Sequence, residues 1–199
     1  MSETPFTTTE PSDAAINAAR QTLTKWHTPQ HFASAVESFA RLVKSATLFN
    51  KPNVGFLLDA IPIAEFTKHR AVDSVRLVEQ SERLNDGQFK KADEIIDVEV
   101  TEALAPGRKR GDEYRSGRAN VTHHDFDPKL GETISIQLAN AVKKKAAKGY
   151  PSKPLLLVYL NIGTGGRLGN EVEKTINELK AQYADNFHEI CVLWAGKLY

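Results

Sequence analysis

Leu155-Leu156-Leu157-Val158-Tyr159-Leu160 is the longest apolar run of the chain, and it decides the fold class. A strand this uniformly apolar has to be covered on both faces, because it lacks the polar alternation of a strand with one solvated face. The run is also far too short to cross a bilayer. It therefore predicts a strand at the centre of a sheet that carries helices on its faces.

The residues around this run alternate between helix and strand. Apolar residues at helical spacing predict a helix over residues 134–146, which Gly149 terminates, and a second helix over about 170–184. A strand over 188–194 follows and contains the single cysteine, Cys191, whose thiol is expected to be buried and inert. This alternation predicts an α/β fold with a mixed sheet and helices on its faces.

The N-terminal part is expected to begin with helices. Residues 1–11 show no apolar period and are expected to form a disordered tail, which leaves residues 12–199 as a single α/β domain. Ser12 is placed to cap a first helix, and Thr28 followed by Pro29 begins a second one. The composition, 41% hydrophobic and 26% charged, is typical of a globular protein.

The pattern is less regular before the first acidic segment. The apolar stretch 54–70 is interrupted by Pro62, which leaves either a short helix or an extended segment after a turn. Residues 74–84 fit helix and strand equally well. Asn85-Asp86-Gly87 is a turn signal, so a chain reversal is expected there.

A strand over about Glu94 to Leu104 carries acids among its β-favouring residues. Because side chains alternate between the two faces of a strand, Asp97 and Glu99 point the same way. Such carboxylates repel each other unless water solvates them or a cation lies between them, and oxygen ligands suit Mg²⁺ or Mn²⁺. A solvated face and a metal site both stay open. If the two acids repel, Glu99→Gln should raise the melting temperature of the metal-free protein.

This succession of elements resembles the PD-(D/E)XK, or restriction-endonuclease-like, superfamily over about residues 30–194. The elements are a helix bearing Glu37, the strand with Asp97-Val98-Glu99-Val100-Thr101, a further helix, and the apolar strand at 155–160. The resemblance implies a restriction-endonuclease-like core. It also implies that acids on the strands bind a divalent ion that activates water, with a lysine assisting.

The resemblance further assigns roles to individual residues. Glu99 matches the second acid of the family motif, and the preceding acid is Asp97 or Asp93. Thr101 stands where the motif has lysine, so the lysine has to come from Lys145 on the following helix or from Lys109 in the loop. Asp97 and Glu99 would hold Mg²⁺ or Mn²⁺. The catalytic set implied in this way consists of Asp97, Glu99, Glu37 and Lys145.

A basic segment over residues 106–118 leaves the end of the same strand. Its cationic side chains can contact phosphate oxygens, and Tyr114 can stack on a base. DNA or RNA is therefore the expected partner, with a mobile solvated loop as the alternative interpretation. The residues expected to bind substrate phosphate are Arg108, Lys109, Arg110 and Arg115.

Three other motifs are expected to be structural rather than functional. The lysines between 143 and 148 are expected to form the solvated face of their helix. His123-His124-Asp125 contains zinc-ligand residue types, but adjacent histidines in an extended segment point in opposite directions. The glycine-rich segment 163–169 lacks the Gly-Lys-Ser/Thr of a Walker loop and is expected to be a turn, with nucleotide binding as an alternative.

The sequence thus predicts a metal-dependent nuclease-like protein that acts on nucleic acid. Two alternatives stay open: a catalytically inactive scaffold that binds nucleic acid or protein through the 106–118 segment, and a nucleotide-binding protein that uses the 163–169 segment. The N-terminus lacks a secretory signal and no run could span a membrane, so a cytoplasmic protein is expected. Its oligomeric state is open, with a homodimer among the alternatives.

Overall fold

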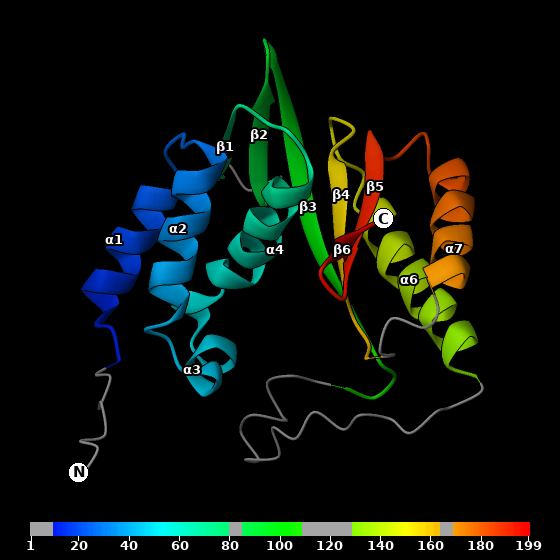
Figure 1. Cartoon of the computed structure of the whole chain (residues 1–199), viewed down its shortest axis with the longest axis horizontal. Helices are drawn as coiled ribbons and strands as arrows, with labels where there is room; N and C mark the ends of the chain where they lie inside the picture. The colour runs from blue at the N-terminus through cyan, green and yellow to red at the C-terminus, as the bar shows by residue number, and fades with distance from the viewer. Residues whose placement is uncertain (1–9, 80–84, 109–128, 164–168) are drawn as a thin grey trace.

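The computed structural model describes residues 10–79, 85–108, 129–163 and 169–199. In this part of the chain, one six-stranded mixed sheet carries helices on both faces (Figure 1). This arrangement confirms the predicted mixed α/β class. The strands are β1 (Ser74–Leu77), β2 (Gly87–Lys91), β3 (Glu94–Leu104), β4 (Leu155–Asn161), β5 (Glu189–Trp194) and β6 (Lys197–Leu198).

The strands follow the order of the sequence across the sheet, from β1 to β6. β4 lies inside the sheet and pairs in parallel with β3 on one side and β5 on the other, as the apolar run 155–160 predicts. The β1–β2, β2–β3 and β5–β6 pairs are antiparallel.

Helices cover the two faces of the sheet separately. α1 (Asp13–Leu23), α2 (Pro29–Ala40) and α4 (Phe56–His69) pack on the face that includes Leu157 and Cys191. α6 (Leu130–Ala146) and α7 (Gly169–Gln182) pack on the face that includes Leu156 and Val158 (Figure 1). Because alternate residues of β4 enter different cores, the apolar run is buried apart from Tyr159, which is 37% exposed. The Cys191 thiol is buried, as expected, and burial raises its pKa to about 12.

The predicted helix starts at Ser12 and Thr28 are confirmed. The Ser12 hydroxyl accepts a hydrogen bond from the backbone N–H of Ala15, and the Thr28 hydroxyl accepts one from His31. Residues 1–9 of the expected tail lie outside the described residues. The expected tail does not extend to Glu10, whose carboxylate accepts a hydrogen bond from the hydroxyl of Thr47 in α3 (Ser45–Asn50).

The sequence left residues 54–70 open between a helix and an extended segment. In the structure, Val54 is the last residue of a short 3-10 helix, η1 (Pro52–Val54), and the residues from Phe56 onward form α4. α4 continues through Pro62 because its apolar residues, among them Phe56 and Ile63, are buried against the sheet at helical spacing. Within the described residues, no helix is both long enough and apolar enough to cross a membrane.

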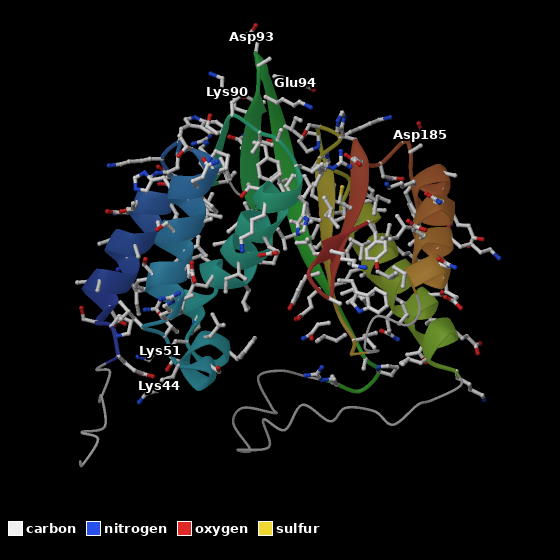
Figure 2. The ribbon with its side chains drawn as sticks, in the orientation of Figure 1. Lys44, Lys51, Lys90, Asp93, Glu94 and Asp185 are labelled. Atoms are coloured by element: carbon white, nitrogen blue, oxygen red, sulfur yellow. The ribbon has the colours of Figure 1, made fainter. Side chains whose placement is uncertain are left out.

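Two chain reversals frame β2. The chain reverses before β2, because β1 and β2 are antiparallel, but Asp86 and Gly87 of the predicted turn already pair with Val78 and Leu77. The other, between β2 and β3, was not predicted and places Ala92 at a φ of 53°. Lys90, Asp93 and Glu94 lie at the tip of this hairpin, at the far end from α3 (Figure 2). Asp93 therefore cannot be the acid that accompanies Glu99.

β3 is longer than β2, and this difference creates the candidate site. The pairing of β2 with β3 ends at Gly87 and Val98. Beyond this pair, the described residues provide β3 with a strand partner on its β4 side alone. The carboxylate of Asp86 occupies the place where β2 would continue, because its Oδ2 accepts a hydrogen bond of 2.7 Å from the backbone N–H of Val100.

Candidate functional site

Glu99 lies on β3 just past the end of β2, on the face covered by α6. Its side chain is 2% exposed, and its Oε1 accepts hydrogen bonds from the ammonium groups of Lys145 at 2.5 Å and Lys148 at 2.8 Å. A buried carboxylate without partners would be very costly. The two lysines therefore make the burial of Glu99 possible.

The helical repeat of α6 directs these lysines toward the sheet. The buried residues Ile134, Leu138 and Val142 define the sheet-facing side, and Lys145 continues that side by one further turn. The expected solvated lysine face is confirmed for the exposed Lys143, Lys144 and Lys148, although Lys148 also bonds Glu99, and it is wrong for Lys145, whose side chain is 14% exposed.

Asp86 is the second acid of the site. Its Oδ2 lies 4.0 Å from the Lys145 ammonium and accepts the hydrogen bond from Val100. Burial, followed by the negative charge of Glu99, raises the pKa of Asp86 above its usual range. Lys145 thus lies near two carboxylates, one just before β2 and the other in the middle of β3.

Asp59 approaches the same place from α4, on the opposite side of the sheet. Burial raises its pKa to about 7, and the charges of Asp86 and Glu99 add to the effect, whereas Lys145 and Arg20 oppose it. Charges on the two faces of the sheet influence each other here, because β2 has ended and no longer separates them. Asp59, Asp86 and Glu99 are called the acid cluster below.

A cavity of about 360 Å³ opens beside the acid cluster. Its lining includes Arg20, Asp59, Asn85, Asp86 and Lys148. The side-chain oxygen of Asn85 is buried and has no hydrogen-bond partner in the described part of the chain. The cavity therefore offers both positive charge and an unsatisfied oxygen acceptor next to two carboxylates.

The Tyr150 hydroxyl is a second buried polar group close to Glu99. It has no hydrogen-bond partner of good geometry among the described residues. Burial, followed by its interaction with the negative charge of Glu99, raises the pKa of Tyr150 well above its usual range. Tyr150 therefore stays protonated and can act as a hydrogen-bond donor.

The structure places Asp97 outside this cluster, although it shares a face of β3 with Glu99. One oxygen of its carboxylate accepts a hydrogen bond from Gln88 at 2.8 Å, and the other accepts one from Ser152 at 2.7 Å. The acid that joins Glu99 and Lys145 is Asp86. Metal binding by Asp97 and Glu99 stays a prediction, and the structure brings Asp86 rather than Asp97 to Lys145 and Glu99.

Glu37 also lies apart from the acid cluster. It forms an exposed ion pair of 2.6 Å with Arg41 on α2, and it lines a separate groove between α2 and α4. The helical acid that reaches the cluster is Asp59. Among the residues expected to bind phosphate, Arg108 donates a hydrogen bond to the backbone oxygen of Asn161.

The other motifs lie mostly outside the described residues. They comprise Lys109, Arg110, Tyr114, Arg115, the segment His123-His124-Asp125, and residues 164–168 of the glycine-rich segment.

Asp86 and Asp59 were not predicted as site residues, although the sequence contains a signal for each of them. Asp86 was interpreted only as part of a turn, although a carboxylate that begins a strand can replace a missing strand partner. Asp59 lies three residues after Phe56 and four before Ile63, both of which are buried. A lone acid on the buried side of an apolar helix needs a polar environment, and this requirement points to a site.

Among the described residues, no group of three or more His, Cys, Asp or Glu side chains is arranged to hold a metal ion. Comparison with family models, curated proteins and solved structures yields no match to this chain. The candidate site therefore stands on its geometry and its charges.

Replacing Asp59 by Asn is expected to stabilise the protein above neutral pH. The folded protein keeps a proton on Asp59 up to a pKa of about 7, whereas the ordinary value is 3.8. Stability is therefore lost as pH rises between these values, and an uncharged Asn avoids this loss. Urea unfolding at about pH 5 and about pH 8 should show a larger gain at the higher pH, about 2 to 4 kcal/mol. An equal gain at both pH values, or a loss at the higher one, would contradict this account.

Proposed function

We propose that this chain is a metal-dependent nuclease whose site is formed by Asp86, Glu99 and Lys145. The observation that carries the proposal is the contact between the buried Glu99 carboxylate and the Lys145 ammonium, with Asp86 on the other side of that ammonium. Thr101 stands where the nuclease motif has lysine, and Lys145 from the next helix supplies the ammonium to the same acid.

The order of the elements gives further support to the restriction-endonuclease-like interpretation. A helix bearing an acid, an acidic strand, a helix and an apolar parallel strand follow one another as α4, β3, α6 and β4. The acid on the first of these helices is Asp59 in this proposal, in place of Glu37.

The donor atoms at the site suit a hard divalent cation. Asp86 uses Oδ2 to bond Val100, and Glu99 uses Oε1 to bond the lysines. The other oxygen of Asp86 and the side-chain oxygen of Asn85 accept no hydrogen bond from the described residues. Mg²⁺ commonly takes one or two carboxylates, with waters and substrate phosphates completing its shell. Asp86 and Glu99, with Asn85, would therefore be sufficient to hold Mg²⁺ or Mn²⁺.

The side chains of the chain itself have distinct tasks in this proposal. When bound, a divalent ion acidifies water and offsets phosphate charge. Lys145 holds Glu99 and Asp86 in position. Lys148 lines the cavity and bonds Glu99, so its ammonium is placed to attract the phosphodiester. Arg20 adds positive charge at the other side of the cavity.

The direct test is cleavage of labelled DNA and RNA, single-stranded and duplex, by the full chain. Cleavage is expected with Mg²⁺ or Mn²⁺ and should stop when EDTA removes the ion. A purified chain that cleaves none of these substrates with either ion would refute the enzymatic proposal.

Metal binding also predicts a stability change that does not depend on activity. Mn²⁺ at about a hundredfold excess over its dissociation constant should stabilise the fold by about 2.7 kcal/mol, which raises the melting temperature by about 5 to 10 °C. Asp86→Asn should remove this response, whereas Asp97→Asn should retain it. A response that Asp97→Asn abolishes and Asp86→Asn preserves would move the ion to the other acid.

The inactive-scaffold alternative is favoured by one observation. Two ammonium groups already neutralise Glu99, so the charge of the acid cluster is largely balanced within the protein. If the lysines serve only to neutralise these acids, the chain binds nucleic acid without a metal ion, and its affinity should depend strongly on the salt concentration. The melting temperature should then be insensitive to Mn²⁺.

A further inference from the structure

A second polar groove, of about 290 Å³, runs between β3 and α6. One wall is the segment from residue 101 to residue 108, and the other contains Gln137, Asn140 and Lys144 of α6. Gln137 is half-buried, yet none of these three side chains forms a hydrogen bond or an ion pair with the described residues. This α6 groove thus presents a row of polar groups without protein partners.

Both walls of the α6 groove lead to Glu99. Gln137, Asn140 and Lys144 have the spacing of one stripe along α6. Lys148, which bonds Glu99, lies just past the end of α6, four residues after Lys144. On the opposite wall, Thr101 lies two residues after Glu99 and therefore on the same face of β3.

The groove and the cavity therefore flank one buried carboxylate. The cavity of about 360 Å³ lies on the side of Asp86 and Lys148, and the α6 groove lies along Lys144 and Thr101. A linear ligand in the α6 groove would lie close to Glu99, although Glu99 itself lines neither the groove nor the cavity. The groove is lined by the ammonium of Lys144, the guanidinium of Arg108, two side-chain amides, and the carboxylate of Glu102, which accepts a hydrogen bond from Asn161.

We propose that the α6 groove binds the phosphodiester backbone of a single-stranded nucleic acid next to Glu99. The inference rests on the proposed nuclease function and adds its substrate class. Lys144 supplies positive charge to a phosphate, while the amides of Gln137 and Asn140 donate hydrogen bonds to phosphate or sugar oxygens. Arg108, held by the backbone oxygen of Asn161, adds a second cation at the far end of the groove.

The burial of Glu99 favours a single-stranded nucleic acid over a duplex as the ligand. Glu99 is 2% exposed and does not line the α6 groove, so a phosphodiester can approach it only if the nucleic-acid backbone enters deeply between β3 and α6. Spaces of this volume hold groups the size of individual nucleotides. A flexible single strand can adopt such a path, whereas a duplex is stiff over many base pairs.

α6 offers a matched pair of variants for the test. Lys143 and Lys144 are neighbours on one helix, both are exposed, and neither forms an ion pair with the described residues. Lys144 lines the α6 groove, and Lys143 is not among its lining residues. Lys144→Ala and Lys143→Ala remove the same charge, so only the position differs.

The experiment measures binding of a fluorescein-labelled oligothymidylate, about twelve nucleotides long, to the full chain in EDTA. Lys144→Ala is expected to weaken binding about tenfold, and Lys143→Ala less than about twofold. The slope of log affinity against log salt should fall by about 0.7 for Lys144→Ala. A duplex of the same length should bind more weakly than the single strand.

Three results would overturn the proposal: no binding by the unmodified chain, equal losses for the two variants, or a duplex that binds as tightly as the single strand. Because the assay contains no metal ion, its outcome does not depend on cleavage. If the variants differ as expected but the chain cleaves nothing, the α6 groove stands and the nuclease proposal falls. If the chain cleaves and the variants do not differ, the nuclease proposal stands, and the nucleic acid binds at a place other than the α6 groove.

Discussion

Asp86→Asn is expected to reduce metal-dependent cleavage on the order of 10³-fold, while Asp97→Asn leaves the rate within about threefold. The two substitutions are chemically identical, and both positions lie where β2 and β3 meet. They differ in their partners. Asp86 lies beside the Lys145 ammonium and the cavity, whereas both oxygens of Asp97 are engaged by Gln88 and Ser152.

The measurement is the single-turnover rate on a labelled oligonucleotide at saturating Mn²⁺. Glu99→Gln should show the same loss as Asp86→Asn, because the two carboxylates would share one ion. Circular dichroism and the melting temperature establish that each variant is folded. Equal rates for Asp86→Asn and the unmodified chain would exclude Asp86 from the site, and a large loss in Asp97→Asn alone would restore the assignment made from sequence.

Lys145→Met is expected to lower the free energy of unfolding by about 3 kcal/mol at neutral pH. Methionine keeps most of the volume and apolar surface of the lysine stem, so the change chiefly removes a charge. Glu99 would keep Lys148 as its partner, but Asp86 would lose its nearest cation. Breaking a buried ion pair on one side leaves an uncompensated charge, which is why the expected cost is large.

The pH dependence distinguishes this cause from a packing defect. Lys145 lowers the pKa of Asp86, which burial and Glu99 raise. Without Lys145, the folded-state pKa of Asp86 rises further, so stability is lost as pH increases above the ordinary carboxyl range. Chemical denaturation at about pH 5 and about pH 8 should therefore show the larger loss at the higher pH. Lys143→Met, an exposed change on the same helix, should stay within about 0.5 kcal/mol.

A loss that is independent of pH would contradict this account, because it would show that the charge of Lys145 does not control the pKa of Asp86.

The contacts of Glu99 also reverse an expectation drawn from the sequence. Repulsion between Asp97 and Glu99 suggested that Glu99→Gln would raise the melting temperature of the metal-free protein. Because Glu99 is bonded to two ammonium groups, the same substitution is now expected to lower it.

The elements that depend on local patterns could be predicted from the sequence. β3 covers the residues expected of it, 94–104, and α1 and α2 begin after the predicted capping residues. The apolar run at 155–160 identified a strand with neighbours on both sides and helices on both faces. In each case the deciding interaction lies within the segment or follows from its hydrophobic period.

The composition of the site could be predicted only in part. The period of β3 brought Glu99 into consideration, the resemblance to the nuclease superfamily brought Lys145, and the structure places the two in contact. Asp86 could not be assigned, because its role depends on β2 ending opposite Val98 while β3 continues. Strand register is a tertiary property, and a turn signal such as Asn85-Asp86-Gly87 does not reveal which groups lie beyond the turn.

The order of the strands has a consequence for how the chain folds during synthesis. α1, α2 and α4 are made first, yet the core that they cover also contains Leu157 of β4 and Leu193 of β5. Until β4 and β5 have left the ribosome, these helices can dock only on the surface offered by β1, β2 and β3. Their apolar sides stay partly open during that interval, and exposed apolar surface of this kind favours aggregation and chaperone binding.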